Sequence, residues 1–112
     1  MPLVTPRKVQ TESHKVRRLI AEYLKNRRVK KRYLARIDAI QKQIKQSLEY
    51  LDRNAVHVGD AKAVVAKVLG PAPGSAGPDS WIYPGGTDLE SYRVDFQGDA
   101  VSGKTFVDYY VS

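Results

Sequence analysis

Apolar residues in the first half of the chain recur at intervals of three and four, the spacing of one face of a helix. After Pro6, residues 7–53 contain no glycine or proline. A first apolar stripe consists of Val9, Val16, Leu19, Ile20, Tyr23 and Leu24. A second consists of Tyr33, Ile37, Ile40, Ile44, Leu48 and Leu51. The pattern predicts one long helix, straight or kinked near Asn26; two helices meeting at the basic joint 26–32 are the alternative.

The length of this helical segment implies that another surface must bury its second apolar stripe. About 42 helical residues would span roughly 60 Å, about twice the width of a module built from the rest of the chain. The segment must therefore protrude, fold back or pack on another chain. A stripe of isoleucine and leucine is unfavourable in water. We expect a coiled-coil-like segment that binds a protein partner or a second copy through Tyr33, Ile37, Ile40, Ile44, Leu48 and Leu51.

A short helix and a short strand are predicted next. Asp60 is a plausible N-cap, Gly70 a residue that ends a helix, and Pro71 a stop. The following stretch PAPGSAGPDS has no periodicity and predicts a loop. The apolar run from Trp81 to Tyr83 predicts a first strand, and Trp81 is expected to fill the gap between helix and sheet.

The last third of the chain predicts a hairpin. Residues 89–97 alternate between apolar and polar side chains. Gly98-Asp99 is a two-residue turn signal, favouring type II′ over type I′. A second strand from Ala100 to about Val111 would contain a bulge at Gly103. The expected fold class is α+β: a basic helical segment, residues 1–54, precedes an αβββ module, residues 55–112, in which a short helix packs on a three-stranded antiparallel meander.

The charge is distributed unevenly between these two segments. The net charge is +7. Residues 1–54 hold 15 Lys and Arg against 5 Asp and Glu, whereas residues 55–112 hold 4 against 7. This asymmetry indicates a basic element that meets an acidic partner, either nucleic acid or an acidic protein surface. A solvated helix face and an anionic membrane surface are alternatives. The residues that would contact phosphates are Arg17, Arg18, Lys25, Arg27, Arg28, Lys30, Lys31 and Arg32.

No pattern of catalytic or metal-binding residues is found. The chain has no cysteine, which excludes thiolate chemistry and disulfides. His14 and His57 lack an acidic partner at a recognised spacing, and no phosphate-binding loop is present. We therefore expect a protein that is not an enzyme, with no catalytic residues, cofactor or metal. No apolar run is long enough to span a membrane, and no secretory signal is recognised, so a cytoplasmic location is expected, alone or within a particle assembled there.

Residues 57–103 resemble a known family. A helix ending in V-x-x-x-L-G-P, a loop, W-I-Y and V-x-F-x-G-D-x-V are similar to the small SmpA/OmlA lipoproteins of the outer-membrane β-barrel assembly machinery. The matching residues are Gly59, Val65, Leu69, Gly70, Pro71, Trp81, Tyr83, Val94, Phe96 and Val101. The resemblance implies helices against a three-stranded sheet and a non-catalytic role through protein contacts. The chain departs from the family in lacking a signal peptide and a lipid-bearing cysteine, so outer-membrane assembly is not implied.

The expected function is that of a structural or adaptor protein. It would act through protein–protein contacts in a larger assembly, such as a virion or a secretion device. The alternative is a nucleic-acid-binding protein that uses the basic helix.

Overall fold

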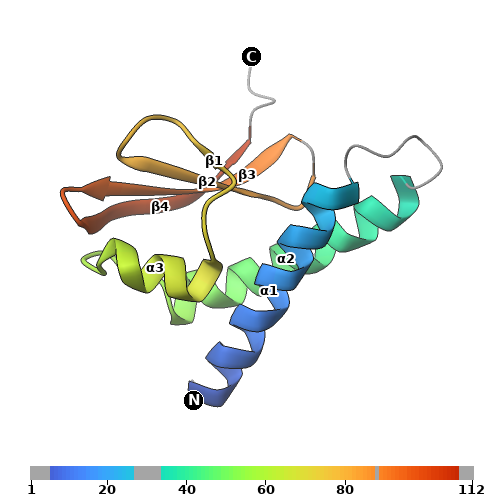
Figure 1. The fold of residues 1–112 in the computed structure, drawn as a ribbon, viewed down its shortest axis with the longest axis horizontal. Helices are drawn as coiled ribbons and strands as arrows, with labels where there is room; N and C mark the ends of the chain where they lie inside the picture. Colours follow the sequence, from blue (N-terminus) through green and yellow to red (C-terminus); the bar gives the residue numbers. More distant parts are fainter. Residues whose placement is uncertain (1–5, 27–33, 88, 109–112) are drawn as a thin grey trace.

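The computed structural model describes residues 6–26, 34–87 and 89–108, and it has an α+β fold (Figure 1). The described elements are α1 (Pro6–Asn26), α2 (Leu34–Asn54), α3 (Lys62–Leu69), β1 (Gly74–Ser75), β2 (Ser80–Pro84), β3 (Glu90–Gln97) and β4 (Ala100–Asp108). The four strands form one antiparallel sheet in the order β1-β2-β3-β4. The predicted fold class is confirmed, with differences in the first helix and in the number of strands.

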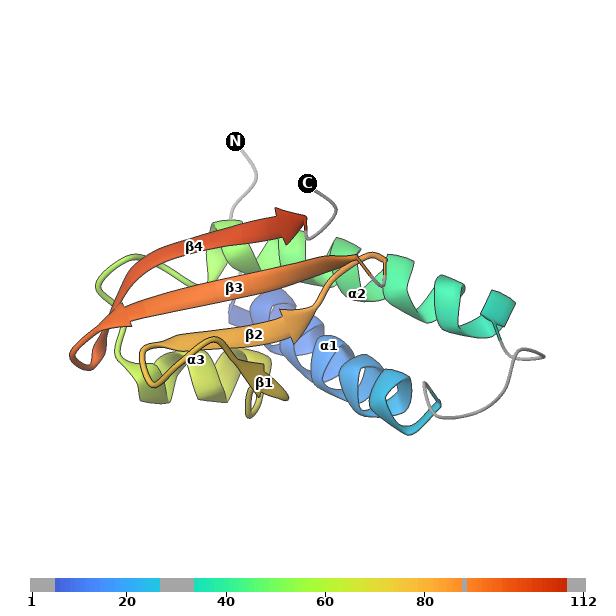
Figure 2. The same cartoon turned by 90° about the horizontal axis from the view of Figure 1, so that it is seen from above.

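The basic segment forms two helices that fold back on each other, so the prediction of one long helix is wrong. Helices α1 and α2 have 21 residues each, and Figures 1 and 2 show them crossing on the same side of the sheet. The molecule measures 41 × 32 × 23 Å, too short for a straight helix of roughly 60 Å. Folding back lets each apolar stripe bury the other, which explains why the stripes point in different directions.

Helix α3 ends as predicted but begins one residue later. Ala61, with φ −69° and ψ 152°, is the N-cap, and it makes no side-chain capping bond. Asp60, the predicted cap, instead accepts a hydrogen bond from the backbone N–H of His57 at 2.9 Å. Gly70 has φ +84° and donates its N–H to the carbonyl of Ala66 at 2.9 Å. Glycine adopts this left-handed conformation at little cost, which suits it to end a helix.

The sheet has a fourth strand that the sequence analysis placed in a loop. Strand β1 has only two residues, Gly74 and Ser75, which pair with Ile82 and Trp81 of β2. Both residues are exposed and lie among prolines and glycines. A two-residue strand is too short to show an alternation of apolar and polar residues. Its pairing therefore depends on the path of the loop, which brings Gly74 and Ser75 beside β2.

The predicted hairpin between β3 and β4 is confirmed. Gln97 pairs with Ala100, and Phe96 with Val101. Gly98, the first residue of the turn, has φ +64°. Asp99, the second, has a negative φ, because no described residue other than glycine has a positive one. A type II′ turn has this combination, whereas a type I′ turn needs a positive φ at both residues. Asp95 pairs with Gly103, so Ser102 is the extra residue of a bulge where one was predicted.

One hydrophobic core joins the two segments that were expected as separate units. It contains Val16 of α1, Leu48 of α2 and Val65 of α3, together with Tyr83 and Tyr92 of the sheet. All three helices lie on one face of the sheet (Figure 1). The fold is therefore two layers around a shared core, the sheet and the helices. In Figure 2, α2 lies behind β3 and β4, and α1 diverges from it toward β2, where Tyr23 and Leu24 line a depression with Tyr83 and Pro84.

Trp81 lies at the margin of this core rather than at its centre. Its ring contacts Phe96 edge-on, with 4.6 Å between ring centroids, and its side chain is partly buried. Tyr83 and Tyr92, both fully buried, occupy the central positions instead. The tyrosine hydroxyls reach polar partners there: Tyr83 donates to the carbonyl of Gly70 at 2.8 Å, and Tyr92 to Asp52 at 2.6 Å.

Candidate functional site

The apolar stripe predicted to bind a partner lies inside the chain's own core. Ile37, Ile40, Ile44, Leu48 and Leu51 are 7, 5, 0, 0 and 0 % exposed. Tyr33, the sixth residue of that prediction, lies outside the described residues. Because α1 and the sheet cover this face of α2, the described part of the stripe is not a surface for a partner, and that prediction is corrected.

The basic residues divide between α1 and the stretch that the structure does not describe. Arg17, Arg18 and Lys25 are exposed on α1. The other five predicted phosphate contacts, Arg27, Arg28, Lys30, Lys31 and Arg32, lie outside the described residues. The three placed cations share the helix face turned away from α2, which leaves them accessible to an acidic partner.

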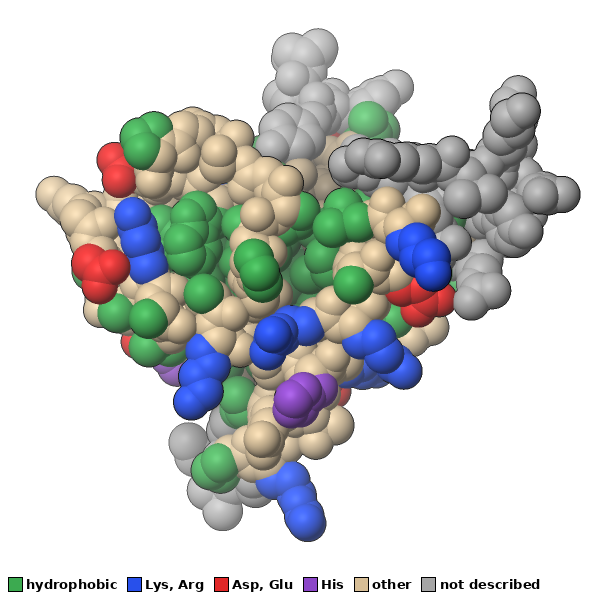
Figure 3. All heavy atoms as spheres, in the orientation of Figure 1, with side chains coloured by type: hydrophobic (Ala, Val, Ile, Leu, Met, Phe, Trp, Pro, Cys, Tyr) green, Lys and Arg blue, Asp and Glu red, His purple; other side chains and the backbone are tan. Residues whose placement is uncertain are grey.

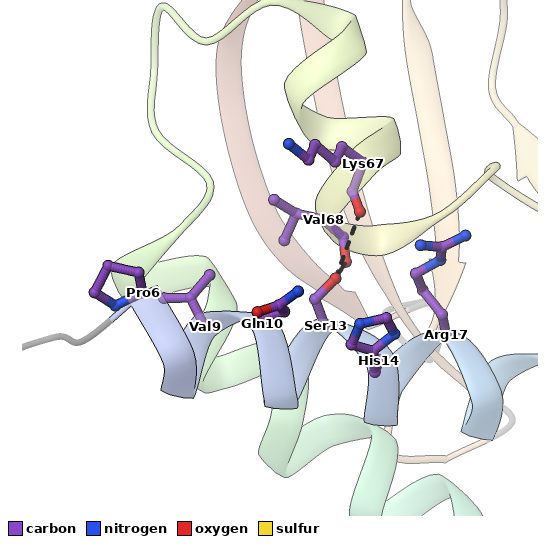
Figure 4. Close-up of a pocket in the computed structure, with 8 residues that line it drawn as sticks. All are labelled: Pro6, Val9, Gln10, Ser13, His14, Arg17, Lys67 and Val68. Atoms are coloured by element: carbon purple, nitrogen blue, oxygen red, sulfur yellow. Dashed lines mark hydrogen bonds between the residues drawn. The ribbon is translucent and has the colours of Figure 1, made fainter.

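A groove runs along α1 where this helix meets α3 and the loop that follows it. It consists of two adjoining depressions, of about 590 and 680 Å³, which share His14 and Arg17. Residues of the first depression are Pro6, Val9, Gln10, Ser13, His14, Arg17, Lys67 and Val68, drawn in Figure 4. The second adds Arg18, Ile20, Ala21, Leu24, Leu69, Gly70 and residues 71–73. Apolar side chains and cationic ones therefore line the same concave surface.

Polar contacts from α1 stabilise the end of α3 and fix the shape of this groove. The hydroxyl of Ser13 donates to the carbonyl of Val68 and contacts that of Lys67 at 3.4 Å, and Figure 4 shows it pointing at both. The last carbonyls of a helix have no partner within the helix, so a donor from outside stabilises them. Arg17 packs over Gly70, where an added Cβ would lie 3.2 Å from the Cγ atom of Arg17.

The groove lies where the positive charge of α1 and α3 is concentrated. Helix α1 carries six Lys and Arg against two Glu, and α3 adds two lysines and no acid. Residues 70–108 hold six Asp and Glu against two basic residues. Figure 3 shows Lys and Arg side chains gathered over the lower part of the molecule, where α1 and α3 lie. The charge asymmetry of the sequence is thus an asymmetry of the folded surface.

Two carboxylates of β3, those of Glu90 and Asp95, are engaged by neighbouring groups. Burial tends to raise the pKa of Glu90, but hydrogen bonds from Lys45 at 2.7 Å and from the Gly86 N–H at 2.8 Å, with the Lys45 charge, lower it overall. Hydrogen bonds from Arg93 and then Ser80 lower the pKa of Asp95. Glu90 thus joins the sheet to α2, and Asp95 joins β3 to β2, so we assign both carboxylates a structural role.

The histidines occupy surface positions in the described structure. His14 lies in the groove, and Nδ1 of His57 is 3.6 Å from a carboxylate oxygen of Asp60. Within residues 6–26, 34–87 and 89–108, no three His, Cys, Asp or Glu side chains come together as metal ligands would. The helices of that same part of the chain are all too short or too polar to cross a membrane.

Sequence reasoning missed half of the groove. It identified the cations of α1, but it did not connect this helix with the end of α3. Ser13 lies more than 50 residues before Lys67 and Val68 along the chain. The one available signal was Gly70-Pro71 at the end of α3, because a helix end requires donors for its carbonyls. Nothing in the sequence says which segment supplies them.

Comparison with known proteins adds no relative to this description. No protein-family model matches the chain, and neither a curated protein nor a solved structure matches it significantly. The resemblance of residues 57–103 to the SmpA/OmlA domain stays a prediction, and the function has to be argued from the groove itself.

Proposed function

We propose that this chain is a non-catalytic adaptor or structural module that binds an acidic, partly apolar segment of a partner protein in the groove between α1 and α3. The observation that carries this proposal is the composition of the groove. Arg18 and Lys67 supply positive charge around a surface that also includes Val9, Val68 and Leu24. A segment with carboxylates on one side and apolar side chains on the other complements both features.

The apolar part of the groove favours a protein over nucleic acid. Contacts to phosphates require cations and donors, and they gain little from aliphatic side chains. The alternative function, nucleic-acid binding through Arg17, Arg18 and Lys25, depends on the charge alone. Both functions depend on the positively charged residues of α1, so charge-reversal variants alone do not distinguish them. Binding must therefore be measured with both an acidic peptide and a nucleic acid.

The test uses a synthetic helical peptide with leucine at intervals of three and four among glutamates. We expect it to bind the protein and to shift the amide resonances of Val9, His14 and Val68. Arg18→Glu combined with Lys67→Glu should weaken binding at least tenfold. The matched control, Lys42→Glu combined with Arg53→Glu, changes the net charge equally at exposed positions of α2 and should leave binding nearly unchanged.

Three outcomes would overturn the proposal. Equal losses in the two double variants would mean that only net charge matters. Equal binding of a peptide with lysines in place of the glutamates would exclude charge complementarity. Binding of a generic DNA duplex with a steep salt dependence, together with no binding of the acidic peptide, would favour the nucleic-acid alternative.

A further inference from the structure

The two edges of the sheet differ in how well they are protected. Strand β1 forms one edge and has two residues, whereas β4 forms the other and has nine (Figure 2). A long edge strand presents unpaired backbone groups and invites another strand to pair with it, and short edge strands avoid this. The edge of β4 is therefore the part of the described sheet best suited to receive a strand.

Only the turn end of β4 is covered by another described segment. The N–H of Val101 donates to the Asp60 carbonyl, and the N–H of Gly59 donates to the Val101 carbonyl, each at 2.8 Å. An isolated bridge between Ala61 and Ala100 lies beside them. Strand β4 continues beyond this cover to Asp108. The open part of the edge thus follows the bulge.

The register shows which residues of β4 direct their backbone groups toward this edge. Phe96 donates its N–H to the Asp79 carbonyl at 2.8 Å, away from β4. Alternate residues of β3 therefore share this direction, and their partners on β4 direct their own N–H and C=O groups outward. These partners are Lys104, Phe106 and Asp108, opposite Val94, Tyr92 and Glu90.

We propose that a second copy of this chain pairs with β4, antiparallel and centred on Phe106, so that a twofold axis passes between the two strands. The stretch Lys104-Thr105-Phe106-Val107-Asp108 is self-complementary in this register. Lys104 of each copy lies opposite Asp108 of the other, on the same face of the sheet. Twofold pairing repeats each favourable charge pair and closes the assembly at two copies. The result is one continuous eight-stranded sheet, with the groove of each copy on its own helical layer.

A cysteine experiment tests both the dimer and its register, because the natural chain has no cysteine. In the proposed register Thr105 of one copy lies opposite Val107 of the other. Both side chains are on the face away from the helices, because Phe106 between them packs on Tyr92 of the core with 4.9 Å between ring centroids. An equal mixture of Thr105→Cys and Val107→Cys chains should give a disulfide-linked dimer under mild oxidation. Either variant alone should give several-fold less, because like positions lie diagonally apart.

A second experiment tests the charge pairs by light scattering. The unmodified chain should show the mass of a dimer at high micromolar concentration, and Asp108→Lys should shift it toward the monomer by placing two lysines opposite each other. Chains carrying Lys104→Glu, mixed with Asp108→Lys chains, should restore the dimer. Circular dichroism verifies that each variant is folded, since Lys104 also contacts Asp52. A monomeric natural chain, a dimer insensitive to Asp108→Lys, or equal cross-linking of each cysteine variant alone would overturn the proposal.

Discussion

Helices α1 and α2 have the same length and similar amphipathic patterns, yet the fold covers them differently. Helix α2 has α1 on one side and the sheet on the other, so five of its stripe residues are at most 7 % exposed. Helix α1 contacts α2 and the end of α3, but Leu24 at its C-terminal end remains partly exposed in the groove. An apolar stripe thus predicts that a face will be buried, but not what will bury it. The basic residues Arg17, Arg18 and Lys25 of α1 are exposed because α2 packs against the opposite, apolar face of this helix.

The largest expected effect on stability comes from replacing one leucine on each helix with alanine. Leu48→Ala in α2 should lower the free energy of unfolding by about 2–5 kcal/mol, because a fully buried side chain leaves a cavity. Leu24→Ala in α1 should cost less, about 1–2 kcal/mol, because solvent already reaches part of it. Urea denaturation measures both values. Equal losses would mean that α1 is covered as fully as α2.

An intermediate effect is expected where α1 meets α3. Gly70→Ala should destabilise the protein by about 1–3 kcal/mol, because alanine is strained at φ +84° and its Cβ presses on Arg17. The control is Gly74→Ala, where the nearest atom is an ordinary 3.7 Å away and the change should stay within about 0.5 kcal/mol. Thermal unfolding compares the two variants. A similar decrease in melting temperature for both would contradict the importance assigned to Gly70 where α1 meets α3.

The smallest effect is expected at the ionic contact between α2 and the sheet. Glu90→Gln should cost about 1–2 kcal/mol near neutral pH by removing the charged hydrogen bond with Lys45. The folded-state pKa of Glu90 is lowered, so this stabilisation is present above the unfolded value of about 4.3 and is lost as the pH falls through the folded pKa.

The difference in melting temperature between the natural chain and Glu90→Gln should therefore shrink from pH 7 to pH 3. The control is Asp38→Asn on the outer side of α2. Asp38 pairs with Lys42, but the two side chains are 57 and 71 % exposed, so the change should stay within about 0.5 kcal/mol at either pH. A difference for Glu90→Gln that grows toward acid pH would contradict the assigned contact.

Some elements were predictable because their signals are local. The turn at Gly98-Asp99 and the end of α3 at Gly70 both depend on positive φ angles that glycine adopts easily. The alternation that buries Tyr92, Val94 and Phe96 follows from the two faces of a strand. In each case a few neighbouring residues are enough to decide the structure.

The sequence by itself determined that the basic segment is helical, where α3, β2, β3 and β4 form, the reversal between β3 and β4, and the concentration of positive charge in the first half of the chain. Tertiary structure alone decided that the basic segment folds back, that β1 joins the sheet and that Ser13 meets the end of α3. These outcomes depend on contacts between residues far apart in sequence, whose free energy comes from burying surfaces together. A periodic pattern predicts which face of a helix is apolar. Which other element buries that face is decided only when the chain folds.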